Sequence, residues 1–126
     1  MLGRFFGASR RDFDSLSEQE VLALAIASEE EDARIYRAYA DGLAEAYPAS
    51  AAVFTAMAAE EDGHRHRLIA LHQQRFGESI PLIGRQHVRG FYERTPDWLV
   101  RPLGLEKTRS MAMQMEDQAR RFYEAA

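Results

Sequence analysis

The sequence predicts an all-α protein built from long helices, and two observations lead to this prediction. Apolar residues recur at spacings of three, four or seven over long stretches, which is the period of one helix face. The chain has 126 residues, of which 46% are hydrophobic and 29% charged, as is typical of one folded domain. We expect an N-terminal arm over residues 1–16 and a helical domain over residues 17–126.

The first long helix is predicted from about residue 18 to about residue 47. Ser17 and Glu20 form a capping-box pattern, in which each side chain bonds to the backbone N–H of the other residue. Pro48 interrupts the apolar pattern after Tyr47. The predicted buried face consists of Leu22, Ile26, Ala33, Tyr36, Ala40 and Leu43.

The second helix is predicted over about 49–76, beginning near Pro48, because proline suits the first turn of a helix. Gly77 is a natural stop at its C-terminal end. Two long helices joined by a short turn are expected to pack as an antiparallel hairpin. The apolar face of this helix reads Val53, Phe54, Met57, Leu68 and Leu71.

Proline and glycine are frequent in residues 78–104, so this segment is predicted to be a linker with only short helices. Within it, Arg85–Arg94 is expected to form a short helix and residues 97–100 a turn. A third long helix is predicted over about 105–126, with Met111, Met115, Ala119 and Phe122 on its inner face.

Composition excludes several classes of function. The 16 basic residues and 20 acidic residues give a net charge of −4, which argues against a nucleic-acid binder. Cysteine is absent, which excludes disulfides, a thiol nucleophile and thiolate-bound metal. The longest apolar stretch, residues 21–27, is far shorter than the roughly 20 residues of a spanning helix. The basic and aromatic start of the arm is expected to lie on the surface, with a membrane or partner contact as the alternative.

Acidic and imidazole side chains fall on the apolar faces of the two predicted hairpin helices. Glu29 lies three positions after Ile26 and four before Ala33. Glu61 and His64 form a Glu-x-x-His pattern, which puts both groups on one side of the second helix. Burying a carboxylate without a partner is costly, so these positions require compensation by a cation or an ion pair.

The third helix offers one more inward acid, Glu116. It precedes Tyr123 by seven residues, as Glu29 precedes Tyr36, and the two segments indicate an internal repeat. Both tyrosines are expected to be core aromatics, and Tyr36 is a candidate hydrogen-bond donor to the metal ligands. His72 is expected to be a surface or structural residue.

Together these residues point to a di-metal site. Di-iron carboxylate bundles take one Glu from each of two helices and a Glu-x-x-His from each of two others. Carboxylate and imidazole ligands suit iron or manganese, and zinc can occupy such sites as well. We therefore predict metal ligation by Glu29, Glu61, His64 and Glu116.

Three segments of the chain bear a family resemblance: Leu22–Ala40, Ala59–Arg65 and the linker Trp98–Leu105. In these segments the chain resembles the rubrerythrin-like, ferritin-like domain of the membrane-bound ferritin (erythrin–vacuolar iron transporter) family. The resemblance implies a ferritin-like fold that binds two metal ions and oxidises ferrous iron with dioxygen or peroxide. It also implies a cytoplasmic domain at the inner membrane that serves a C-terminal membrane transporter exporting iron.

The sequence departs from the pattern of this family in one respect. It holds a single Glu-x-x-His and ends at Ala126, before a fourth helix, so we expect a fragment. Two hairpins related by a two-fold axis would supply two copies each of Glu29, Glu61 and His64, and a homodimer is therefore expected. The alternatives are a half-empty site and a third helix exchanged between chains, with Glu116 still contributing.

A different class of function is also compatible with the sequence. In a non-enzymatic helical dimerisation or interaction module, the acids at positions 29 and 61 would pair with Arg34, Arg65 or Arg67. The acidic strings would then be solvated faces, and no metal would bind.

Overall fold

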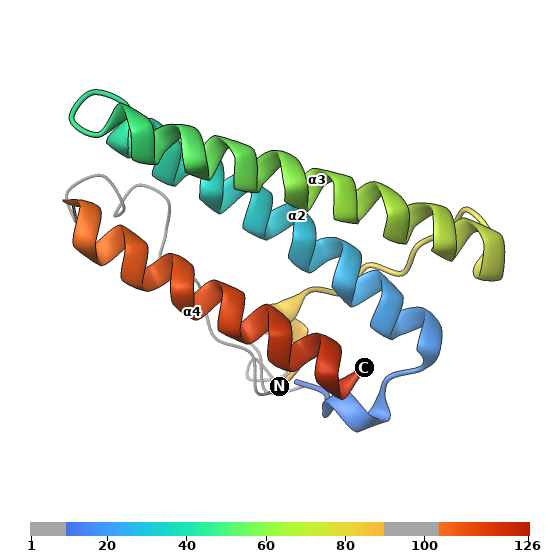
Figure 1. The fold of residues 1–126 in the computed structure, drawn as a ribbon. Helices are drawn as coiled ribbons and strands as arrows, with labels where there is room; N and C mark the ends of the chain where they lie inside the picture. The colour runs from blue at the N-terminus through green and yellow to red at the C-terminus, as the bar shows by residue number, and fades with distance from the viewer. Residues whose placement is uncertain (1–9, 90–103) are drawn as a thin grey trace, which may run out of the picture. The chain divides into compact units, whose positions relative to one another are not determined.

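The computed structural model describes residues 10–89 and 104–126, and this part of the chain is helical (Figure 1). Three α-helices, α2 (Glu18–Leu43), α3 (Pro48–Phe76) and α4 (Gly104–Ala125), are accompanied by the single 3-10 turns η1 (Phe13–Ser15) and η2 (Arg85–His87). In these ranges the only β-type pairing is one isolated bridge between Arg11 and Val88. The all-α prediction is confirmed.

Helix α2 begins where the capping box predicts. The Ser17 backbone N–H donates to Glu20 Oε1, and the Glu20 N–H donates to Ser17 Oγ, both at 3.1 Å. The Arg11 guanidinium also donates to the Glu20 carboxylate. This hydrogen bond and the one from the Ser17 N–H lower the pKa of Glu20 from its usual value.

The junction between the two long helices differs from the prediction, because α2 ends at Leu43 and not near Tyr47. The Tyr47 N–H still donates to Leu43 O at 2.8 Å, so residues 44–46 form a turn rather than regular helix. Pro48 explains the difference, since the residue before a proline is disfavoured in the α-helical region. Helix α3 ends at Phe76, followed by Gly77 in the left-handed region with φ of +86°.

The described part of the linker is tied to the N-terminal arm. The Arg11 N–H donates to His87 O at 2.9 Å, and the Arg89 N–H donates to Arg11 O at 2.8 Å. Of the short helix expected over Arg85–Arg94, the structure has the 3-10 turn η2 at its start, and residues 90–94 lie outside the described residues. The Gly84 N–H donates to His87 Nδ1. The turn predicted over residues 97–100 and the arm's residues 1–9 lie outside the described residues.

Contacts divide the chain into two compact units, of which the first comprises Met1–Glu30 and His64–Arg94. Here the first half of α2 lies antiparallel to the last part of α3 (Figure 1). Leu24 is fully buried, and Glu18 forms an ion pair with Arg75. His72 is also fully buried, and its Nδ1 lies 3.1 Å from Gly77 O. Of the two expected environments, surface or interior, the structure places His72 in the interior.

The second unit comprises Glu31–Gly63 and Thr95–Ala126. Its core is aromatic: the Tyr39 and Phe54 rings meet edge-on at 5.5 Å, and Tyr36 stacks on Phe54 at 6.2 Å. Helix α4 covers these rings with Ala112 and Met115, which are both buried. Of the predicted inner face of this helix, Met115 and Phe122 are buried, whereas Ala112 was not predicted.

Burial of Leu24 predicts a measurable difference in stability between two leucine substitutions. Leu24→Ala removes a side chain with no exposed surface and is expected to lower the free energy of unfolding by about 2–5 kcal/mol. Leu82→Ala is the matched control, because Leu82 is 99% exposed and its loss is expected to cost less than about 0.5 kcal/mol. Urea denaturation measures the free energy of unfolding of both variants. Equal losses of stability would contradict the burial of Leu24.

Candidate metal centre

Glu29 is a buried carboxylate on α2, with 5% of its surface exposed. The helix places it on the same side as Ile26 and Ala33, which are buried as well, while Glu30 turns outward and is exposed. The apolar periodicity therefore located this buried carboxylate correctly. A carboxylate in such surroundings requires a compensating positive charge or hydrogen bonds.

His64 on α3 faces Glu29. His64 Nδ1 lies 3.6 Å from Glu29 Oε2, and the two side chains are 39% and 6% exposed. This separation exceeds the 2.7–3.2 Å of an ordinary hydrogen bond. Instead, it suits two ligands that hold a common cation between them.

Glu61 joins this pair through the geometry of α3 itself. It precedes His64 by three residues on one uninterrupted helix, so the two side chains lie one turn apart on the same side. One ligand atom from each of Glu29, Glu61 and His64 lies within 4.8 Å of the others. Two ligands on opposite sides of one ion are about 4.2 Å apart, so three donors at this spacing fit a single cation with modest adjustment. The structure thus brings together three of the four predicted ligands.

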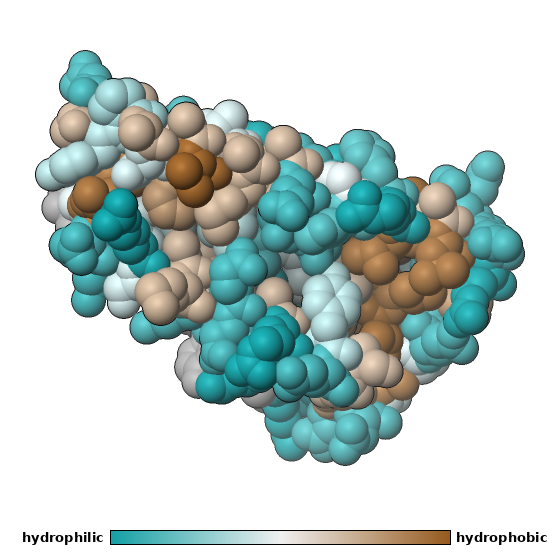
Figure 2. Space-filling view, in the orientation of Figure 1, coloured by the Kyte–Doolittle hydropathy of each residue, from teal (hydrophilic) through white to brown (hydrophobic). Residues whose placement is uncertain are grey.

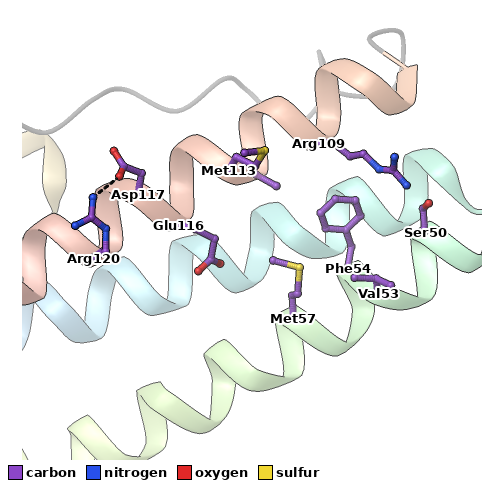
Figure 3. Close-up of a pocket in the computed structure, with 10 residues that line it drawn as sticks. Ser50, Val53, Phe54, Met57, Arg109, Met113, Glu116, Asp117 and Arg120 are labelled. Atoms are coloured by element: carbon purple, nitrogen blue, oxygen red, sulfur yellow. Dashed lines mark hydrogen bonds and ion pairs between the residues drawn. The ribbon is translucent and has the colours of Figure 1, made fainter.

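Glu116, the fourth predicted ligand, is not a member of this group. It lies on α4 and accepts a 2.6 Å hydrogen bond from the Tyr36 hydroxyl. Figure 3 shows its carboxylate on the side of α4 that faces Met57 on α3. Tyr36 is buried, as expected for a core aromatic, whereas Tyr123 is 45% exposed, so the expectation of a second core tyrosine was wrong. Tyr123 is the third residue from the C-terminal end of α4.

Two charged features of the site region were missed from the sequence. Asp32 is buried, with 4% of its surface exposed, and the sequence analysis did not single it out. Its spacing of three from Glu29 could have revealed this, because that spacing keeps both residues near one helix face. Arg37 forms an ion pair with Asp62, which links α2 to α3 in the second unit. Nothing in the sequence pairs these two residues, which are 25 positions apart.

In residues 10–89 and 104–126, no helix is long and apolar enough to cross a membrane.

Comparison with known proteins yields one match. The family model described as Rubrerythrin matches residues 20–126, which is most of the chain. No curated protein and no solved structure matches the sequence.

The Tyr36–Glu116 hydrogen bond predicts a cost for removing the hydroxyl. Tyr36→Phe is expected to lower the free energy of unfolding by about 1.5 kcal/mol or more, the usual value for a hydrogen bond to a charged group. Tyr47→Phe serves as the control, since Tyr47 is 44% exposed, and a change below about 0.5 kcal/mol is expected. If the Tyr36→Phe protein were as stable as this control, the hydrogen bond would make no contribution to the free energy of unfolding.

Proposed function

The chain belongs to the rubrerythrin family, and we propose that Glu29, Glu61 and His64 form part of a di-iron carboxylate site in which ferrous iron is oxidised. The observation that supports this proposal most directly is the convergence of two carboxylates and one imidazole on a common point. Each donor stands on a long helix, so the backbone fixes the position from which each side chain reaches that point.

The donor set fits iron. Carboxylate oxygens and imidazole nitrogen are ligands of ferrous iron and manganese, and without cysteine the chain offers no thiolate that would favour softer metals. Glu29 and Glu61 would bind as anions and neutralise cationic charge, while His64 would bind through a ring nitrogen as neutral imidazole. Two ferrous ions held by these residues would supply one electron each to dioxygen or to peroxide.

The protein's own contribution is geometry and exclusion of water. Glu29 sits among buried apolar side chains of α2, including Ala25, Ile26 and Ala33. These neighbours keep water from the inner side of the carboxylate and strengthen its attraction for a cation. His64 and Glu61 are only partly buried, so they leave a route by which iron and the oxidant reach the site.

Three donors are fewer than a complete di-iron site requires, which is four Glu and two His in such bundles. In the second unit, α4 covers Tyr36 and Tyr39, a part of the hairpin face that a two-fold hairpin dimer would use. The hairpin dimer would supply four Glu and two His and would bind two iron ions per pair of chains. The alternatives are a half-empty site and an α4 exchanged between chains, which would add Glu116 to the ligands.

We further propose that the domain serves a membrane iron exporter at the cytoplasmic face of the membrane. The support for this role is the likeness of Trp98–Leu105 and the two helix segments to the membrane-bound ferritin family. In this role, oxidation at the site would couple iron capture to its removal from the cytoplasm.

An anaerobic ferrous titration tests the site. The wild-type chain is expected to bind iron at a fixed stoichiometry, and His64→Ala is expected to weaken binding at least about 100-fold. Removing a residue that only orients a metal ligand already lowers metal affinity by about 10–100-fold. His66→Ala is the matched control, because His66 is an exposed histidine two positions away and iron affinity is expected to stay unchanged.

Glu29→Gln separates the metal site from an interaction module. In the proposed site this isosteric change removes an anionic ligand, so iron binding falls while the far-UV circular dichroism spectrum stays helical. If Glu29 instead served an ion pair with Arg34 or Arg65, the variant would lose stability with no change in iron content. The latter result would contradict the proposed function.

Oxidation is tested by mixing the ferrous-loaded protein with dioxygen or with peroxide and following the ferric absorbance in the near ultraviolet. Two ferrous ions reduce dioxygen to hydrogen peroxide, or hydrogen peroxide to two water molecules, with uptake of two protons in each case. Wild-type protein is expected to react faster than free ferrous iron, and His64→Ala no faster. If iron in the wild-type protein were oxidised no faster than free ferrous iron, the site would bind iron without promoting its oxidation.

A further inference from the structure

An ion pair joins α2 to α3 next to the proposed iron ligands of α3. The Arg37 guanidinium on α2 donates to the Asp62 carboxylate on α3. Asp62 follows Glu61 directly and precedes His64 by two residues. The proposed iron chemistry does not use this ion pair, although Asp62 lies within one helical turn of both ligands.

Asp62 is not placed to bind the metal itself. At about 100° per residue, its side chain leaves α3 about 100° away from that of Glu61 and about 160° away from that of His64. Asp62 is also not a member of the group in which the three proposed ligands converge. It therefore acts on iron only through its charge or through the position of α3.

The ion pair runs diagonally across the hairpin. Tyr36 precedes Arg37 on α2, and its ring stacks on Phe54 of α3. Asp62 lies eight residues further along α3 than Phe54, which is about 12 Å along the helix axis. Side chains tilt toward the N-terminus of their own helix, so in this antiparallel hairpin (Figure 1) Arg37 and Asp62 lean toward each other along the axis. A diagonal contact of this kind resists sliding of α3 along α2.

Such sliding matters more to a metal site than to the stability of the hairpin. The Arg37 and Asp62 side chains are 54% and 28% exposed. Around them, the apolar surface over the N-terminal half of α3 gives way to hydrophilic surface toward the middle of the helix (Figure 2). An ion pair in hydrated surroundings adds little to stability. Metal ligands, in contrast, must be held to within about 0.5 Å, which is about a third of the axial rise of one residue.

We propose that Arg37 is a positioning residue of the iron site, which through Asp62 holds the part of α3 that carries Glu61 in register with α2. Arg37 acts through this ligand and not by contact with iron or the oxidant. The inference rests on the proposed function, because a small shift of α3 is costly only where its side chains must meet a metal ion.

The charge of Arg37 gives this inference a distinctive sign. A guanidinium near a cation site repels the cation, so loss of its charge alone would strengthen iron binding. Loss of its contact with Asp62 instead allows α3 to shift and weakens iron binding. The two effects are opposite, and one substitution therefore distinguishes them.

Arg37→Gln removes the ion pair at an exposed position and is the decisive variant. Anaerobic ferrous titration is expected to show about tenfold weaker binding, the lower end of the loss found when a residue that orients a metal ligand is removed. The urea midpoint is expected to move little, because exposed ion pairs contribute little to stability.

Arg75→Gln is the matched control. Arg75 is 54% exposed, as Arg37 is, and it also ties α3 to α2, through Glu18. This second ion pair is not diagonal, because its members lie eleven residues from Glu29 and from His64, respectively, and these two ligands face each other. Loss of the second pair is expected to leave iron affinity unchanged.

Hydrogen–deuterium exchange on the metal-free chain provides a second readout. The backbone amides of residues 58–66 are expected to exchange faster in Arg37→Gln, by up to about fivefold, and at the wild-type rate in Arg75→Gln. Unchanged exchange in Arg37→Gln would overturn the role of the ion pair in holding α3.

The titration separates failure of this inference from failure of the proposed function. If the wild-type chain binds iron and Arg37→Gln binds it equally or more tightly, only the positioning role is overturned. Equal losses of affinity in Arg37→Gln and Arg75→Gln would overturn it as well. A wild-type chain without affinity for iron would overturn the proposed function and this inference with it, whatever the exchange rates.

Discussion

The burial of the Glu29 carboxylate is the constraint on which the site depends. An ionised carboxylate amid apolar side chains is costly unless a cation or hydrogen bonds compensate for it. The His64 imidazole on the neighbouring helix lies 3.6 Å from the Glu29 carboxylate. The spacing leaves room for a cation between the two groups, and Glu61 reaches the same point from one turn away. Replacing a buried ionic group by a well-packed hydrophobic residue is often neutral or stabilising, so the buried carboxylate at position 29 points to a binding role.

The helices and the central ligand group could be predicted from the sequence because both depend on local geometry. The capping box at Ser17 and Glu20 fixes the start of α2, and the 3.6-residue period locates Glu29 within its buried face. The Glu61–His64 pair follows from helical spacing alone. Such features follow from the geometry of one helix, so they can be predicted without knowledge of how the helices pack.

The remaining features depend on packing between helices, which periodicity does not encode. The sequence predicted Glu116 as an inward acid and a fourth ligand, but Glu116 is exposed and does not belong to the group of the other three. Its carboxylate accepts instead from the Tyr36 hydroxyl. Tyr123 resembles Tyr36 in spacing but lies near the end of α4, where it is 45% exposed. The end of α2 at Leu43 was missed because the pattern continues to Tyr47, while Pro48 restricts the residue before it.

Diffraction from crystals soaked anaerobically in ferrous iron, collected at the iron absorption edge, tests the central claim most directly. An anomalous difference map is predicted to show iron within bonding distance of Glu29, Glu61 and His64, with a ring nitrogen among its ligands. Iron found only at exposed carboxylates, with no density at this cluster, would contradict the account. The buried Glu29 would then have to be explained by the ion pairs of an interaction module.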